Sequence, residues 1–273
     1  MDEFGGSVRP AFDTEDARLA EKPGIAMAFQ AIVDVDAKVV FGYEALAAKI
    51  TVPAQESIPS ALSPELTASE LANAADAVSL ALRLDLSGML MTKVAEAEVA
   101  SSDTESLVAG CLAAARGFPP SRLVYQLVHE GSRAYRSLLR ELMSGLKHEG
   151  FSTAIEEFGA PRCGLDLLAH LQPDAVKLNP ALIRNIDRDP VQQFKVTGIN
   201  HLCSEMGIDV VAVGVRTVNE CKALRDAGLR LFQGPFFAPS AFEKLPEVYP
   251  AAWPAIQQCK PRRFSWHSHR GSG

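Results

Sequence analysis

The sequence predicts an α/β protein, an irregular TIM-like (β/α)8 barrel in which the first strand is antiparallel to its neighbour. Strand-like and helix-like segments alternate through most of the 273 residues, which is typical of a mostly parallel sheet. About eight such strands within ~250 residues favour a closed barrel. An open doubly wound sheet is the alternative, and the absence of a GxGxxG motif after the first strand argues against it.

The predicted barrel begins with a hairpin. Residues 25–33 and 39–46 alternate in hydrophobicity and flank the polar segment 34–38, so we expect two antiparallel strands. Residues 52–64 contain three prolines and predict a loop. Residues 67–70 match a capping box that opens a helix ending near residue 84.

The middle of the chain continues the alternation. Short runs with strand character cover residues 89–94, 123–128 and 153–157. Ser102 or Asp103 can cap a helix that runs to Arg116. A second helix is expected over residues 132–149, ended by Gly150, and a loop is expected over 159–164.

The last part of the chain repeats the same units. Strands are predicted at residues 175–179, 209–213 and 229–233. The helices between them cover residues 190–206 and 218–227, and a glycine follows each one.

The two ends of the chain differ from this core. Residues 1–22 are polar and predict a flexible leader, 23–250 form the predicted barrel, and 251–273 form a C-terminal helix remnant with a basic and aromatic tail. Such a tail could bind an anionic surface, but its short length and its Gly-Ser-Gly ending favour a solvated segment.

Composition excludes several classes of function. A net charge of -6 argues against broad nucleic-acid binding, which needs a basic face. No signal peptide and no apolar run long enough to cross a bilayer are present, so no membrane partner and a cytoplasmic location are expected. The five cysteines are widely spaced and form no CxxC pair, which indicates reduced thiols rather than a disulfide framework or a zinc ribbon.

Polar side chains follow the predicted strands at their carboxyl ends. In a β/α barrel these ends converge on one mouth, where active sites are built. The residues at the strand ends in this chain are Glu44, Thr92, Gln126 to His129, Glu156, Glu157, Lys177, Asn179, Val213 to Arg216 and Gln233.

This set resembles the EAL domain family, the cyclic di-GMP phosphodiesterases of bacterial signalling, over roughly residues 25–245. The resemblance is specific because several motifs recur in order, and the versions linked to flavin light sensors are the most similar. The matching segments are Phe29–Val33 for FQPIV, Tyr43–Leu46 for YEAL, Glu156–Gly159 for DDFG, Pro173–Asn179 for PDxVKLD, Ala212–Arg216 for AEGVE and Phe232–Gly234 for the closing QG.

The resemblance implies a two-metal site, but most of its ligand positions are substituted here. Glu44 and Lys177 are kept, and Val213 and Arg216 stand at the two AEGVE glutamates, one of which positions or activates water. Among the implied metal ligands, Thr92 stands for an asparagine, Gln126 for the first FEITE glutamate, Glu156 and Glu157 for the DDFG aspartates, and Asn179 for the KLD aspartate. His129 stands for the second FEITE glutamate.

These substitutions predict a mouth that holds no metal. Gln126 and Asn179 keep a carbonyl oxygen but lose charge, and Val213 can neither bind metal nor orient water. Mg²⁺ requires near-ideal octahedral geometry at about 2.0–2.1 Å, which the longer glutamates would disturb. No cofactor is therefore expected, and Mg²⁺ or Mn²⁺ would be needed only if activity were retained.

Dinucleotide binding is weakened as well. The resemblance places Gln30, Leu46, Arg162 and Gln233 around a bound dinucleotide, but the arginine expected after the EAL motif is Ala48. Arg162 or Arg216 could still attract a phosphate. The sequence thus argues against tight cyclic di-GMP binding, though less strongly than against hydrolysis.

A structural role is the simpler interpretation of the residues that remain. A buried lysine is costly unless it is paired, so Lys177 is expected to form a salt bridge with Glu44, Glu156 or Glu157. Glu44 is then a hydrogen-bonded remnant rather than a metal ligand.

Three functions follow from these observations. The first is a catalytically inactive EAL-like domain that regulates bacterial signalling by binding another protein, with a homodimer as a further option. The second is a receptor that binds cyclic di-GMP without hydrolysing it. The third is a weak metal-dependent cyclic di-GMP phosphodiesterase.

Overall fold

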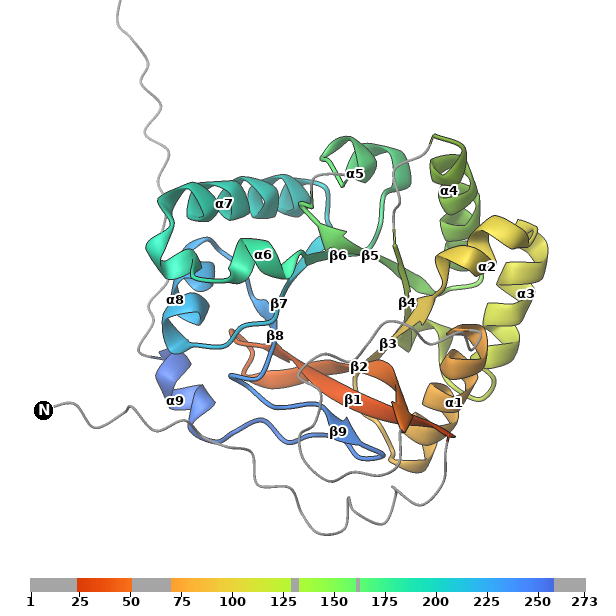
Figure 1. The fold of residues 1–273 in the computed structure, drawn as a ribbon, viewed down its shortest axis with the longest axis horizontal. Helices are drawn as coiled ribbons and strands as arrows, with labels where there is room; N and C mark the ends of the chain where they lie inside the picture. Colours follow the sequence, from red (N-terminus) through yellow and green to blue (C-terminus); the bar gives the residue numbers. More distant parts are fainter. Residues whose placement is uncertain (1–23, 51–69, 129–132, 161–162, 258–273) are drawn as a thin grey trace, which may run out of the picture.

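The computed structural model describes residues 24–50, 70–128, 133–160 and 163–257, which form a closed barrel with helices around it (Figure 1). The strand order is β2-β3-β4-β5-β6-β7-β8-β1-β9, and β2 also pairs with β1, so strands β1 to β8 close on themselves. The strands are β1 Gly24–Asp34, β2 Val39–Ile50, β3 Met89–Val94, β4 Leu123–Leu127, β5 Ser152–Phe158, β6 Ala175–Leu178, β7 Asp209–Val213, β8 Leu231–Gln233 and β9 Ala241–Phe242.

Strand direction confirms the irregular barrel predicted from the sequence. Strand β1 pairs antiparallel with β2 and with β8, whereas β2 through β8 are parallel to one another. The hairpin connection at residues 34–38 causes this reversal, because a two-stranded hairpin must be antiparallel. The carboxyl ends of β2 to β8 therefore share one end of the barrel, where β1 begins.

The helices surround the barrel in the outer layer seen in Figure 1. No helix of the described residues is long and apolar enough to cross a membrane. The helices are α1 Glu70–Arg83, α2 Glu96–Ser101, α3 Thr104–Ala114, α4 Arg133–His148, α5 Asp166–Leu171, α6 Pro180–Ile183, α7 Pro190–Glu205, α8 Val218–Asp226 and α9 Ala252–Gln257.

Local sequence signals explain where several helices begin. The Asp103 side chain accepts a hydrogen bond from the Ser106 amide at 2.8 Å, which caps α3 and selects Asp103 over Ser102. Asp189 caps α7 in the same way, and Thr217 opens α8 with a full capping box. The predicted capping box at residues 67–70 lies almost entirely outside the described residues, as do the predicted loop at 52–64, the leader and the tail beyond residue 257.

Three short helices, α2, α5 and α6, were not predicted. Each has four to six residues, too few to show a helical period in the sequence. Several predicted boundaries are also corrected. Strand β2 continues to Ile50 rather than ending at residue 46, and β8 begins at Leu231 rather than at residue 229. Helix α3 ends at Ala114 rather than at Arg116, because the chain turns there before Gly117, which has a φ of +86°.

Two apolar cores position the site. The larger core lies between the strands and the helices and includes the fully buried rings of Phe29, Tyr125 and Phe232. The smaller core fills the inside of the barrel, where side chains from seven strands meet below the mouth. These interior residues are Ile32, Met91, Val124, Ala154, Ala175, Val211 and Leu231.

Candidate functional site

The polar residues of the mouth stand directly above the interior core. Side chains alternate between the two faces of a strand, so a residue two positions beyond an interior residue also points inward. Lys177 follows the interior residue Ala175 in this way, and Gln126 follows Val124. The same rule places the following residues in the mouth: Gln30, Glu44, Lys93, Glu156, Val213 and Gln233.

Glu44 is the centre of this group and is only 4% exposed. Its Oε1 atom accepts hydrogen bonds from Lys177 Nζ at 2.5 Å and from Gln126 Nε2 at 3.2 Å. Its Oε2 atom accepts from Gln233 Nε2 at 2.5 Å. Both carboxylate oxygens therefore accept hydrogen bonds from residues on other strands. These bonds compensate a negative charge that would otherwise be costly to bury.

Two lysines neutralise the two buried carboxylates of the mouth. Lys177 Nζ lies 2.5 Å from Glu44 Oε1, 2.7 Å from Gln126 Oε1 and 3.4 Å from Glu156 Oε1. Lys93 Nζ lies 3.0 Å from the other oxygen, Glu156 Oε2. The predicted pairing of Lys177 with Glu44 or Glu156 is thus present with both partners.

The charge network also fixes the ionisation of Glu44. Burial acts to raise the pKa of this carboxyl, but Lys177 and Lys93 oppose that effect, together with hydrogen bonds from Lys177 and Gln233. The outcome is a pKa lowered from 4.5 to about 2. Glu44 is therefore ionised at neutral pH and cannot serve as a proton donor there.

This donor set does not fit a divalent metal. Hard cations bind several oxygen ligands, mostly carboxylates with available lone pairs. Here each side-chain oxygen of Glu44, Glu156, Gln126 and Gln30 already accepts from at least one N–H donor. Within the described residues, no group of three or more His, Cys, Asp or Glu side chains could hold a metal ion.

The two glutamines are oriented by their partners. Gln233 Nε2 donates to Gln30 Oε1 at 2.9 Å and to Glu44 Oε2. Reversing this amide would place its Oε1 against these two acceptor oxygens, so the orientation is fixed. Gln233 Oε1 is consequently a buried acceptor with no partner among the described residues. Gln126 donates to Glu44 and accepts from Lys177, a bridge that a glutamate at this position could not form.

Several residues predicted for the mouth lie elsewhere. Thr92 is buried but shares the face of β3 with Leu90 and Val94, which pack against the helices, so the expectation that it stands in the mouth is wrong. Asn179 Oδ1 caps α6 by accepting from the Ala181 amide at 2.8 Å. Glu157 is exposed and has a φ of +51°, at the irregularity where β5 and β6 shift register.

The remaining predicted residues show a mixed result. Val213 packs against the interior core and brings only a hydrocarbon surface to the mouth. Arg216 is exposed just beyond β7, where its backbone N–H donates to Glu220 Oε2 at 2.9 Å. Leu46 is half-buried on β2. His129 and Arg162 lie outside the described residues.

Lys93 is the mouth residue that sequence reasoning missed. It lies next to Thr92, and the two face opposite sides of β3. The signal that could have found it is the alternation from Met91, but β3 is apolar on both faces at Met89–Met91 and so shows no readable period.

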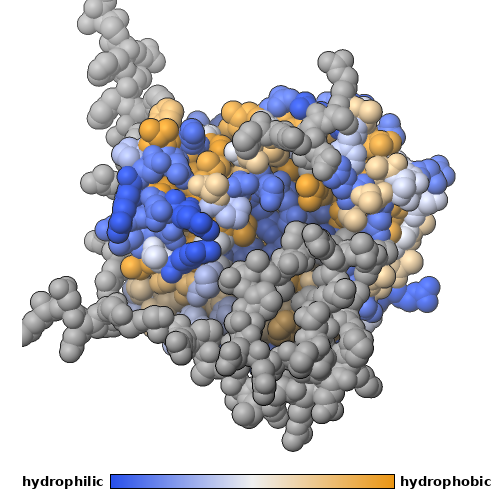
Figure 2. Space-filling view, in the orientation of Figure 1, coloured by the Kyte–Doolittle hydropathy of each residue, from blue (hydrophilic) through white to orange (hydrophobic). Residues whose placement is uncertain are grey.

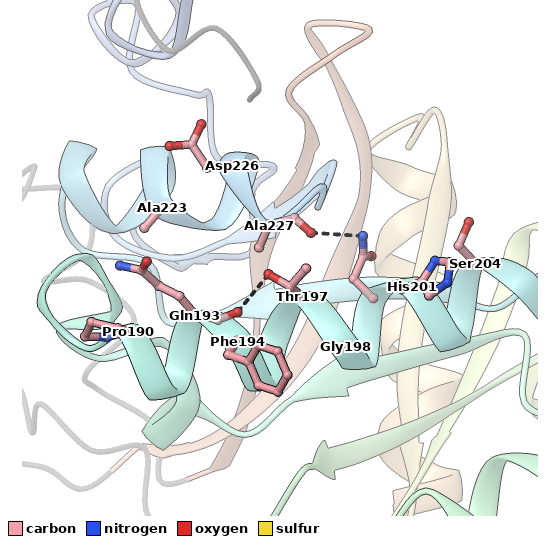
Figure 3. Close-up of a pocket in the computed structure, with 11 residues that line it drawn as sticks. Pro190, Gln193, Phe194, Thr197, Gly198, His201, Ser204, Ala223, Asp226 and Ala227 are labelled. Carbon is pink, nitrogen blue, oxygen red and sulfur yellow. Dashed lines mark hydrogen bonds between the residues drawn. The ribbon is translucent and has the colours of Figure 1, made fainter. Parts of the chain in front are cut away.

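A separate groove lies between α7 and α8, on the outer side of the barrel wall (Figure 3). It has a volume of about 610 Å³ and runs beside Phe194, whose ring is 77% exposed. Figure 2, in contrast, shows hydrophilic residues at the centre of the view, where the strands of Figure 1 meet. The polar mouth and the partly apolar groove are therefore distinct surfaces.

Comparison with known proteins agrees with the fold and the motifs. The chain is 29% identical over 240 residues to the blue light- and temperature-regulated antirepressor BluF of Escherichia coli K12, which covers 83% of this chain and 56% of that protein. It is 30% identical, with a TM-score of 0.73, to a standalone EAL protein from Vibrio cholerae O395 solved with bound c-di-GMP, covering 85% of this chain and 98% of that one.

A second solved relative is BlrP1 of Klebsiella pneumoniae, determined as a calcium and cyclic di-GMP complex. It is 28% identical with a TM-score of 0.71 and covers 84% of this chain but only 58% of its own. The chain thus spans little more than half the length of BluF and BlrP1. The sequence profile of the EAL domain matches residues 14–240, and the chain therefore belongs to the EAL domain family.

Proposed function

We propose that this EAL domain is catalytically inactive and acts in bacterial signalling as a regulatory module that binds another protein. One observation carries the proposal: every carboxylate oxygen buried in the mouth is already bound by an N–H donor of the chain itself. Two carboxylates and two ammonium groups cancel, so the buried part of the mouth has no excess negative charge with which to hold a metal pair.

Among the described residues, Val213, Glu44 and Asn179 offer no general base for hydrolysis, which supports the same proposal. Hydrolysis of a phosphodiester requires an activated water as well as charge stabilisation. Val213 has no group that could take a proton, and Glu44 is held as an ion inside a saturated network. The side-chain oxygen of Asn179 already accepts a hydrogen bond as the N-cap of α6. None of these three residues is arranged for the chemistry.

The relative BluF supports the protein-directed part of the proposal. An antirepressor is a protein that counteracts a repressor, and BluF matches this chain over 83% of its length. A barrel keeps its scaffold when its site changes, because the residues that stabilise it are separate from those at the mouth. A partner protein, with a second copy of the chain as another option, is therefore the proposed ligand.

Cyclic di-GMP binding without hydrolysis is the second candidate. It is favoured by the two solved relatives that hold this dinucleotide at 30% and 28% identity. Arg216 is also exposed just beyond β7, and a guanidinium group suits a phosphate. Weak metal-dependent hydrolysis is the third candidate, because other relatives such as PdeD of Escherichia coli are described as probable cyclic di-GMP phosphodiesterases.

One experiment separates the three candidates. The purified chain is incubated with cyclic di-GMP and either Mn²⁺ or Mg²⁺, the products are separated, and binding is titrated by calorimetry in parallel. The proposal expects neither linear dinucleotide nor saturable heat. Saturable heat without product would support the receptor, and turnover of about 1 s⁻¹ or more would establish an enzyme.

The protein partner is sought by co-purification from the native host, with and without added cyclic di-GMP. A specific protein recovered in both conditions supports the proposal. Recovery of no protein in either condition, together with saturable cyclic di-GMP binding, would overturn it in favour of the receptor.

A further inference from the structure

The ammonium groups of the mouth are arranged like a bound cation. Lys177 Nζ has three oxygen neighbours at 2.5, 2.7 and 3.4 Å, supplied by strands β2, β4 and β5. Lys93 Nζ approaches the same Glu156 carboxylate from β3, at 3.0 Å. Lys177 is a position of the family motifs that this chain keeps, so Lys93 is the cation to be explained.

We propose that Lys93 is a built-in cation that takes the place of a divalent metal, and that it alone decides whether the mouth can accept one. The inference goes beyond the proposed function, because it concerns the cation chemistry of the mouth and holds whether or not the domain binds a protein. The reason is that each carboxylate oxygen of the mouth already accepts a hydrogen bond from an N–H donor. A metal ion can bind such an oxygen only after its donor has been removed.

Lys93 is the lysine whose removal leaves an accessible opening. Its side chain is 38% exposed, whereas that of Lys177 is only 5% exposed and lies among three acceptors. Removing Lys93 takes one positive charge away and releases Glu156 Oε2, on a carboxylate that is 10% exposed at the top of the network. Removing Lys177 would instead leave the deeply buried charge of Glu44 without its cation.

The oxygen that is released when Lys93 is removed determines which metal ion would bind. Glu156 Oε2 would be released while the oxygens of Glu44 remain hydrogen-bonded, so the opened site offers one free carboxylate oxygen and has room for water ligands. Such a site suits Mn²⁺ or Ca²⁺ better than Mg²⁺, which requires strict octahedral geometry. An asparagine at position 93 would add one amide oxygen from β3 and no charge.

The test compares Mn²⁺ binding by the unmodified chain with that of Lys93→Ala and Lys93→Asn, using calorimetry and the loss of the free Mn²⁺ signal in electron paramagnetic resonance. The unmodified chain is expected to bind no Mn²⁺ at millimolar concentration. Both variants are expected to bind at least about tenfold more tightly, which corresponds to about 1.4 kcal/mol or more. Circular dichroism and thermal melts establish that each variant is folded.

Two further variants control for charge and for surface effects. Lys93→Arg keeps the cation and is expected to bind no Mn²⁺. Lys147→Ala makes the same change in net charge at a lysine of nearly equal exposure, 36%, which pairs with Asp174 at 3.2 Å away from the mouth. It too is expected to leave Mn²⁺ binding unchanged.

Two results would overturn the inference. Saturable Mn²⁺ binding by the unmodified chain would show that the lysines do not exclude metal. A folded Lys93→Ala variant that binds no better than Lys147→Ala would show that Lys93 does not control the site. The second result leaves the proposed function standing, because the unmodified chain would still bind no metal. The first would weaken the proposed function as well, and the hydrolysis assay then tests that function separately.

Discussion

The Nζ atom of Lys177 lies 2.5 Å from Oε1 of Glu44, and this salt bridge crosses the barrel. Lys177 is on β6 and Glu44 is on β2, four strands apart in either direction around the closed sheet. Both side chains are 5% exposed. The pair therefore links opposite walls through the inside of the barrel, and the mouth contributes to the stability of the fold.

The first prediction is that Glu44 makes the stability of the fold depend on pH in the acidic range. The folded-state pKa of Glu44 is about 2, below its ordinary value of 4.5, so its ionisation stabilises the fold fully above pH 4.5. This contribution, on the order of 3 kcal/mol, is lost as the pH falls from about 4.5 to about 2. Urea unfolding across this range, compared with Glu44→Gln, measures it.

Comparison with the variant isolates Glu44 from other acidic groups. Glutamine keeps the shape but cannot titrate, so the variant should be less stable than the unmodified chain at pH 7. The difference in unfolding free energy should shrink as the pH falls from about 4.5 to about 2, where Glu44 of the folded chain is about half protonated. A difference that stays constant between pH 5 and pH 2 would contradict the lowered pKa.

The second prediction is that Lys177→Met destabilises the protein by about 3 kcal/mol, because removal of one partner leaves a buried charge without compensation. Part of the loss should be recovered at low pH, where Glu44 takes up a proton. Lys147→Met is the control, since its ion pair with Asp174 is exposed and should be worth less than about 1 kcal/mol. Equal effects of the two substitutions in urea unfolding would refute a special role for Lys177.

The third prediction is that Val213→Glu alone produces no turnover of cyclic di-GMP. The new carboxylate would enter a mouth in which Lys93 and Lys177 still saturate Glu156 and Glu44. Product analysis with Mn²⁺ and with Mg²⁺, beside an active EAL phosphodiesterase as a positive control, should detect no linear dinucleotide. Turnover of about 1 s⁻¹ or more by this variant would show that the metal site is intact.

The sequence was sufficient to predict the barrel and its central salt bridge, and the reason is periodicity. The strands at residues 89–94 and 209–213 have the predicted bounds, because apolar runs between capped helices are easy to recognise. Lys177 needed a partner, and only the carboxylates at neighbouring strand ends could supply one. The antiparallel first strand followed from the short connection between β1 and β2.

Contacts that depend on which face a residue occupies were harder to predict. A shift of one position moves a side chain to the other face of a strand, and this is the error that put Thr92 in the mouth in place of Lys93. The groove between α7 and α8 could not be predicted either, because its walls come from helices whose spacing is set by tertiary packing.

The fourth prediction concerns the groove wall. Gly198 lies inside α7, and a Cβ atom at this position would meet nothing within 4 Å. Alanine should therefore stabilise the helix by about 0.5–1 kcal/mol, since glycine loses more backbone entropy on folding. For a domain of this size the melting temperature should rise by about 1–4 °C.

Gly234→Ala is the matched control for this substitution. Gly234 has a φ of +154°, and a Cβ atom there would lie 2.2 Å from the Val215 carbonyl oxygen, so the same change should destabilise the protein by about 1–3 kcal/mol or more. A melting temperature lowered by Gly198→Ala would contradict the open space at this position, on the face that lines the groove beside Phe194. It would mean that this face is covered in solution, and size-exclusion chromatography of both variants would then establish whether a second copy of the chain covers it.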